Sequence, residues 1–277
     1  MKRLVLPILL ILTFGVLKTP VETRLLASER AHGFQAAQLN LQLRAQLGQM
    51  GFVAALSGFR AFMADLLWIR AQTAFEKAEW VRMKLLMESA TQLQPKFVMF
   101  WVMAHFHMAY DAATAVKEKR LQKTSEGLQQ PTETLQQPTE ALQRKAEREY
   151  LQIGEQFLLD GIAFNPDSAL LYERLGYLYS KKLFDYERAY EAYTACAQKP
   201  GAMGYIPRFA AYALAEVPGR EREAYAKLRE LYDEGASQRL PSLLHLLQRL
   251  EEKLAIPAPE RVHIPPSLET ARPAPLR

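Results

Sequence analysis

The sequence contains little glycine, asparagine or cysteine, and each shortage excludes a class of structure. Only 13 of its 277 residues are glycine, and its two asparagines are Asn40 and Asn165, so the tight turns of β-hairpins have few residues from which to form. The single cysteine, Cys196, cannot form an internal disulfide, and no Cys-x-x-Cys-His motif is present for covalent haem attachment. Ala, Leu, Gln, Glu, Lys and Arg dominate instead, and all of them favour helices. The composition therefore predicts an all-helical protein.

The distribution of charge argues against a nucleic-acid-binding protein. The net charge is +5, but residues 1–60 carry seven basic and two acidic side chains and account for all of it. The rest of the chain has equal numbers of bases and acids, which alternate along the sequence. Nucleic-acid binding needs a basic face that displaces counterions. We therefore expect no nucleic-acid partner.

The sequence also lacks the common catalytic motifs. It has no Gly-rich phosphate-binding loop, no Gly-x-Ser-x-Gly motif and no His-Glu-x-x-His zinc motif. Adjacent acids such as Asp233 and Glu234 point in different directions on a helix, so they do not form the paired carboxylates of acid–base catalysis. We therefore expect a protein that is not an enzyme and has no cofactor.

A short apolar segment at the N-terminus indicates a membrane anchor. Lys2 and Arg3 precede an uninterrupted apolar run from Leu4 to Leu17, which Lys18 closes. A helix of this length spans roughly 21 Å, less than the hydrocarbon core of about 30 Å, and matches the apolar region of a signal peptide. The residues that follow lack the small-x-small pattern of a cleavage site. We expect an uncleaved signal anchor, with a cleaved signal peptide of atypical site as the alternative.

This interpretation gives the N-terminal boundaries and a location. Residues 1–20 are expected to form the anchor, which enters the membrane through residues 4–17, and residues 21–50 an amphipathic linker helix. Basic residues flank the apolar run on both sides, so the positive-inside rule does not decide its orientation. The basic–apolar–polar order favours a single-pass membrane protein whose body lies outside the cytoplasm.

Residues 169–200 carry the pattern of a helical hairpin. Large and small side chains alternate at helical spacing on one face of each of two helices. The first helix supplies Tyr172, Leu175, Gly176 and Tyr179, and the second Ala189, Tyr193 and Cys196. The small residues Gly176 and Ala189 mark where paired helices approach closely, and Cys196 falls at another small position, as expected of a buried thiol.

This pattern resembles the tetratricopeptide repeat (TPR), with one additional residue in the turn between the helices. The same frame extends in both directions: Pro166 and Pro95 end earlier repeats, and Trp101 stands at the aromatic position, six residues after Pro95. Gly154 and Gly161 occupy small positions of a second helix. The expected repeats are 59–97, 98–166, 169–202 and 205–236, with a capping helix at 242–254.

The resemblance covers residues 50–236. More narrowly, the chain resembles bacterial membrane-anchored TPR proteins in the segments GFRAFMADLLWIRAQ, LQPKF and NPDSALLYERLGYLY. It implies an all-α, right-handed superhelical stack of antiparallel helix pairs over residues 51–254. Two segments depart from the repeat. Four tandem Leu-Gln heptads at 121–148 contain Pro131 and Pro138, which argue against a coiled coil. We expect a mobile insert at 121–143 and a Pro-rich tail at 255–277.

Two histidines raise a remote alternative, a metal-binding protein. His105 and His107 lie two apart on an expected helix and point in different directions, so the two cannot chelate one metal. His107 and Asp111 are four apart and can hydrogen-bond or share a metal with a third ligand. The other interpretation is that residues 97–111, which are rich in methionine and aromatic residues, fill a helical core, with His105 in place of a small packing residue. We expect no metal.

The resemblance implies a non-catalytic adaptor that binds a protein or peptide in a concave groove lined by the first helix of each repeat. Aromatic and arginine side chains are the usual anchors of such interfaces. The candidates expected to be exposed or half-exposed there are Arg60, Arg70, Trp101, Tyr172, Tyr179 and Arg208. The alternative is a constitutive accessory subunit of a larger membrane complex, in which the repeats form a fixed wall.

Overall fold

The computed structural model describes residues 59–118 and 136–262, and within these two ranges its secondary structure is entirely helical. The all-helical prediction is therefore confirmed for this part of the chain. The α-helices are α3 (Arg60–Glu76), α4 (Trp80–Leu93), α5 (Val98–Phe106), α7 (Gln136–Phe164), α8 (Ala169–Leu178), α9 (Tyr186–Ala197), α10 (Ile206–Leu214), α11 (Glu221–Asp233) and α12 (Pro241–Lys253). Two π-helical turns, η1 (His107–Ala112) and η2 (Tyr179–Leu183), continue α5 and α8, and a 3₁₀ turn η3 (Ala258–Glu260) follows α12.

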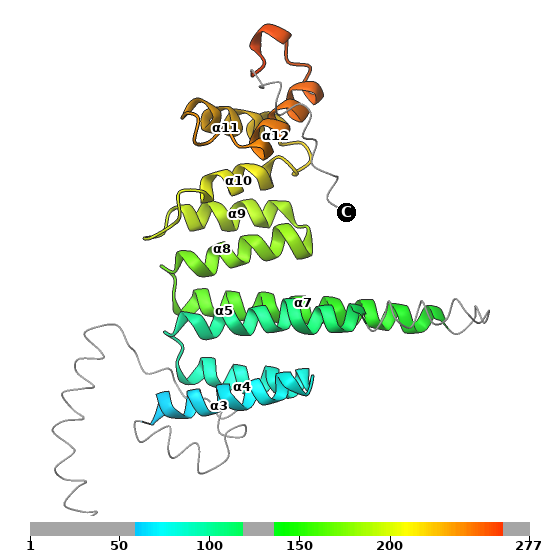
Figure 1. Cartoon of the computed structure of the whole chain (residues 1–277), viewed down its shortest axis with the longest axis vertical. Coiled ribbons are helices and arrows are strands. Elements are labelled where there is room, and N and C mark those ends of the chain that lie inside the picture. The colour runs from blue at the N-terminus through cyan, green and yellow to red at the C-terminus, as the bar shows by residue number, and fades with distance from the viewer. Residues whose placement is uncertain (1–58, 119–135, 263–277) are drawn as a thin grey trace, which may run out of the picture.

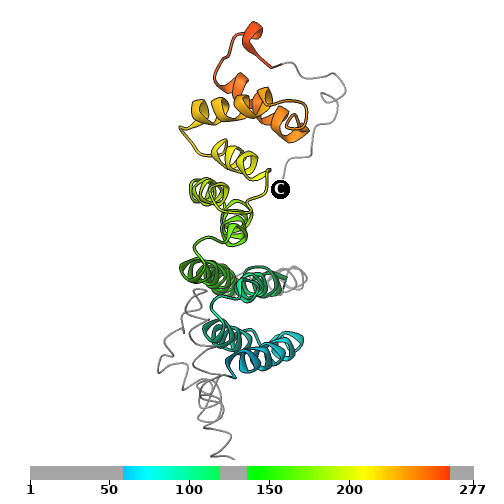
Figure 2. The same cartoon turned by 90° about the vertical axis from the view of Figure 1, so that its left-hand side faces the viewer.

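The helices pack in pairs that succeed one another along the long axis of the molecule (Figure 1). α3 packs on α4, α5 and η1 on α7, α8 on α9, and α10 on α11, as the sequence pattern predicts. Figure 2 shows the same succession with many of the helices seen end-on. The last helix, α12, buries its leucines Leu243, Leu244, Leu247 and Leu250 against the preceding pair. It covers the C-terminal end of the helical array, the role expected for residues 242–254.

Glycines set the distance between paired helices. A Cβ atom on Gly176 would lie 2.7 Å from the Tyr193 ring of α9, the close approach expected at this small position. On α7, a Cβ on Gly161 would lie 2.9 Å from the Trp101 side chain, and one on Gly154 would lie 2.6 Å from Cβ of Ala109. These separations are shorter than side chains tolerate, so only glycine allows the helices to pack this closely.

The additional residue of the expected inter-helix turn lies inside a helix. Tyr179–Leu183 forms the π-helical turn η2, and a π turn takes one more residue per hydrogen bond than an α turn. After it, Phe184 adopts a left-handed backbone conformation (φ 54°), and Asp185 caps α9 by accepting a hydrogen bond from the backbone N–H of Arg188. The turn itself therefore stays short.

The long helix α7 begins earlier than expected. The insert was predicted to be mobile over 121–143, with the helix starting in the last heptad, but α7 starts at Gln136 and includes Pro138. Pro138 is the third residue of the helix, where its missing N–H costs no intrahelical hydrogen bond. The expected anchor, linker, first part of the insert and most of the tail lie outside the described residues. Within the described ranges, no helix has the length and apolar character needed to span a bilayer.

We expect Gly154→Ala to destabilise the protein. The added methyl group would meet Cβ and the backbone N of Ala109 in η1 and the carbonyl oxygen of His105 in α5. These atoms cannot move without separating α7 from its partner helix. The expected loss is about 1–3 kcal/mol, despite the better helix propensity of alanine. Urea unfolding followed by circular dichroism measures it. Gln152→Ala, at an exposed position of α7, is the control and should change stability by less than about 0.5 kcal/mol. An equal effect of both substitutions would contradict the close-packing argument.

Candidate functional site

Two of the six expected contact residues are buried, so the prediction that they are exposed or half-exposed is wrong. Trp101 is 3 % exposed, and its Nε1–H donates to the carbonyl of Pro95 at 2.9 Å. Tyr179 is 5 % exposed, and its hydroxyl donates to Glu155 on α7 at 2.8 Å. The Trp101 ring packs against Phe164 of α7, the second helix of its own pair, whereas Tyr179 reaches α7 from the next pair. Both aromatic positions therefore face a second helix.

The other four expected residues lie on three helices and do not form one cluster. Arg60 and Arg70 belong to α3, where Arg70 is exposed and Arg60 half-buried. Tyr172 on α8 is half-buried, with the Nζ of Lys199 4.8 Å from its ring centre. Arg208 on α10 is half-buried and donates from Nη1 to the side-chain oxygen of Gln238 at 2.9 Å. A role of these residues in partner binding stays a prediction.

A different set of aromatic side chains is exposed on the first helices of the second and third pairs. Phe106 is 46 % exposed and Tyr177 is 40 % exposed, and the half-buried Tyr110 lies between them. The rings of Phe106 and Tyr110 stack with centres 5.1 Å apart, and those of Tyr110 and Tyr177 stack at 6.5 Å. We call these three residues the aromatic ladder. It joins α5 and η1 to α8 and is the candidate functional site.

The sequence carries a signal for this site in the spacing of its aromatic residues. Phe106 follows Trp101 by five residues, and Tyr177 follows Tyr172 by five. A step of five residues on a helix turns roughly 140° away from the starting side chain. The repeat pattern therefore predicts a second aromatic position on a different side of the helix from Trp101 and Tyr172. Tyr110 lies within the π-helical turn η1.

Basic side chains flank the ladder. The Nζ of Lys182 lies 4.5 Å from the ring centre of Tyr110. Burial lowers the pKa of Lys182, and so does the neighbouring charge of Lys117. Burial raises the pKa of the Tyr110 hydroxyl well above its ordinary value, and Tyr177 adds to the shift. At neutral pH the Tyr110 hydroxyl therefore stays protonated, and its ring lies beside the cation of Lys182.

His105 is a buried packing residue rather than a ligand. It is 2 % exposed, and its Nδ1 lies 3.2 Å from the carbonyl oxygen of Gly154. Burial lowers the pKa of His105 to about 4, and the positive charge of Arg174 contributes to the shift. His107 instead pairs with Asp111 at 2.7 Å, the contact expected from their spacing. Within residues 59–118 and 136–262, no three His, Cys, Asp or Glu side chains are grouped as metal ligands.

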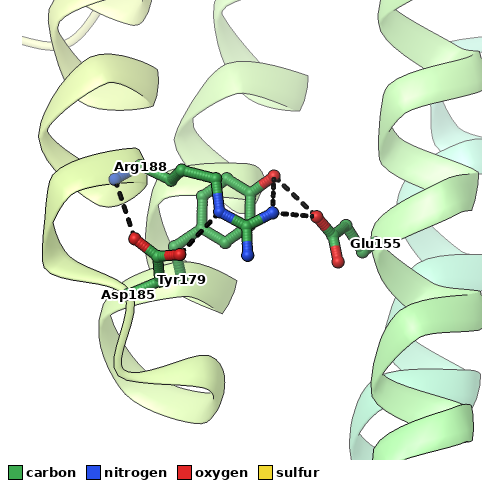
Figure 3. A network of polar contacts seen from close by, with 4 residues as sticks. All are labelled: Glu155, Tyr179, Asp185 and Arg188. Atoms are coloured by element: carbon green, nitrogen blue, oxygen red, sulfur yellow. Dashed lines mark hydrogen bonds and ion pairs between the residues drawn. The ribbon is translucent and has the colours of Figure 1, made fainter.

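The densest polar cluster of the described residues joins the second pair to the third (Figure 3). Arg188 bonds Asp185 at 2.6 Å and Glu155 at 2.8 Å, and its guanidinium lies 4.5 Å from the centre of the Tyr179 ring. Burial alone would raise the pKa of Asp185, but the hydrogen bonds from Arg188 outweigh it and lower that pKa. Burial and the bond to Glu155 raise the pKa of Tyr179. These groups satisfy one another, which indicates a structural connection between the pairs.

Cys196 has the surroundings of a structural thiol. It is buried, its Sγ lies 3.2 Å from the carbonyl oxygen of Ala169, and burial raises its pKa to about 11. A thiol of this pKa stays protonated at neutral pH, so it is a poor nucleophile. The expectation of a buried cysteine is confirmed.

No family model matches this chain, and no curated protein does either. The similarity to tetratricopeptide repeats therefore depends on the residues and on the helix pairs described above. The function has to be argued from the exposed chemistry of the site.

We expect His105 to make the stability of the protein depend on pH. Its pKa is lower in the folded protein (about 4) than the ordinary value of 6.5, so no effect arises above pH 6.5. Below it, the unfolded chain takes up a proton that the folded chain does not, and stability falls by up to about 3 kcal/mol as the pH approaches 4. Urea unfolding at pH 7 and pH 4.5 measures the loss.

The variant His105→Gln provides the comparison, because glutamine can donate to the Gly154 carbonyl but does not titrate. Its stability should fall less between pH 7 and pH 4.5 than that of the natural protein, since the carboxylates titrate alike in both. Equal losses would show that His105 is protonated in the folded protein.

Proposed function

We propose that the chain is a non-catalytic helical-repeat protein that binds another protein or a peptide through the aromatic ladder. In this proposal the helix pairs form a right-handed, TPR-like solenoid, and the ladder lies in its concave groove. The observation that carries the proposal is the exposure of stacked rings at Phe106 and Tyr177. Burial of a large aromatic side chain away from water lowers the free energy, and such side chains are enriched at the centres of interfaces.

The way the ladder is built supports binding rather than folding as its role. Its rings continue across two helix pairs, whereas the core aromatics Trp101 and Tyr193 are covered completely. The surface is also preorganised, because η1 and α8 are each held on a second helix. A preorganised surface loses little conformational entropy when a partner binds.

The membrane location belongs to the same proposal. The apolar run of residues 4–17 would anchor the chain in the bacterial inner membrane, with the helical repeats in the periplasm. An adaptor held in this way would meet its partner at the membrane surface. No enzymatic activity is part of the proposal.

A second candidate is a constitutive subunit of a larger membrane complex, and the surface of α3 favours it. Phe59, Phe62 and Ile69 are each more than half exposed at spacings of three and seven residues, on one side of the helix. Together with the ladder, they give the molecule two exposed apolar surfaces. Permanent assemblies bury larger and more apolar interfaces than transient ones.

We expect the double variant Phe106→Ser, Tyr177→Ser to lose the cross-links that the natural chain forms with its partner in native membranes. Both side chains are exposed, so the fold should be retained, and circular dichroism checks this. Cross-linking mass spectrometry reads the loss as the disappearance of links that start from residues 98–118 and 169–183. The change should remove most of the signal, because interface energy concentrates in a few aromatic residues.

Leu159→Ser is the matched control, because Leu159 is 39 % exposed but lies on the second helix α7. It should leave the cross-links unchanged. Unchanged cross-links in the double variant would refute binding at the ladder. Links to one stoichiometric partner that persist in detergent would favour the constitutive subunit, and links to several partners at low occupancy the adaptor.

A further inference from the structure

An arginine beside the ladder is incompletely satisfied in the folded protein. Arg174 is half-buried on α8, and its buried Nε–H finds no hydrogen-bond acceptor among the described residues. Buried N–H groups are nearly always paired with an acceptor, so an unpaired one calls for an explanation. A guanidinium also presents its donors as a planar fork that fits a carboxylate.

Arg174 lies where a ligand on the ladder would meet it. It precedes Tyr177 by three residues, so the two occupy neighbouring positions on one side of α8. Its charge acts on Tyr110 of η1 and His105 of α5, and also on Tyr205 at the start of α10.

Among the described residues, no carboxylate forms an ion pair with Arg174. The adjacent carboxylate, Glu173, accepts a hydrogen bond from the Tyr205 hydroxyl at 2.9 Å and is held toward α10. The neighbouring His105 is neutral above pH 4, because burial lowers its pKa to about that value. Lys182, 4.5 Å from the Tyr110 ring, and Lys117 add two cations near the ladder, and Glu147 is the carboxylate whose charge acts on Lys182. The surface therefore combines exposed aromatic rings with the positive charges of Arg174, Lys182 and Lys117.

We infer that this surface binds a peptide segment that carries an aromatic or aliphatic side chain next to an aspartate or glutamate. The apolar side chain packs on the aromatic ladder, and the carboxylate accepts hydrogen bonds from the guanidinium of Arg174. This inference rests on the proposed function, since it names the chemistry of the partner that the ladder would bind.

Selection from a phage-displayed library of random dodecapeptides on the full-length protein tests the inference. Peptides fused at their C-terminus to the coat protein have no free terminal carboxylate, so any acid that is enriched is a side chain. We expect the selected peptides to be enriched in Asp or Glu within two residues of an aromatic or large aliphatic residue. One selected peptide is then synthesised with a fluorescent label, and its affinity is measured by anisotropy.

Arg174→Gln should weaken binding of this peptide by about tenfold or more, because a charge-assisted hydrogen bond is lost. Arg174→Lys, which keeps the charge but not the fork, should weaken it less. Arg222→Gln, at an exposed position of α11, is the control and should stay within about twofold. Replacement of the peptide's acid by its amide should reproduce the loss in the natural protein and have little effect in Arg174→Gln.

The outcomes separate this inference from the proposed function. Selected peptides that depend on Phe106 and Tyr177 but lack acids, or that bind Arg174→Gln as tightly as the natural protein, would overturn the role of Arg174 and leave binding at the ladder intact. If no selected peptide depends on Phe106 and Tyr177 for binding, the inference and the proposed function both fail. Enrichment of basic residues in the selected peptides would overturn the inference, because the surface would then attract positive rather than negative charge.

Discussion

The close approach of paired helices is the constraint on which the rest of the structure depends. At Gly154, Gly161 and Gly176 an added Cβ would lie within 3 Å of the partner helix. At each contact a first helix packs one of its sides against a second helix. The large side chains Trp101 and Tyr193 lie at these contacts and fill the space between the two helices. The core is thus built pair by pair, in the way typical of helical repeats.

This one-sided packing also determines which surfaces stay open. A first helix that buries one side between second helices has its opposite side uncovered, and here that side carries Phe106 and Tyr177. The polar cluster of Glu155, Tyr179 and Arg188 connects the second and third pairs (Figure 3). A shift between these pairs would change the distance between the Tyr110 and Tyr177 rings. The cluster therefore stabilises the ladder without being part of it.

The sequence allowed the helix pairs to be predicted because their constraints are local. Small and large residues at helical spacing, and prolines between the repeats, identify the pairs and the positions of Gly176 and Tyr193. The exposed site was harder to predict from the same pattern. Trp101 and Tyr179 are aromatic and lie on first helices, the properties expected of interface anchors, yet the core explains both properties equally well. Only their burial separates the two roles, and it depends on how the helices pack, since α7 of its own pair covers Trp101 and α7 of the preceding pair contacts Tyr179.

The π-helical turns contribute both to the buried core and to the exposed candidate site. η2 lies at the end of its first helix, where the chain turns back toward α9, whereas η1 interrupts its first helix, which continues as an α-helix over residues 113–118. Each contributes a tyrosine whose place depends on the neighbouring pair: Tyr110 stacks with Tyr177 of α8, and Tyr179 bonds Glu155 of α7. A π turn widens the helix locally and often occurs at functional sites. In this chain each π turn carries a tyrosine that contacts the neighbouring pair. A change in the length of either turn would therefore alter both the core and the candidate site.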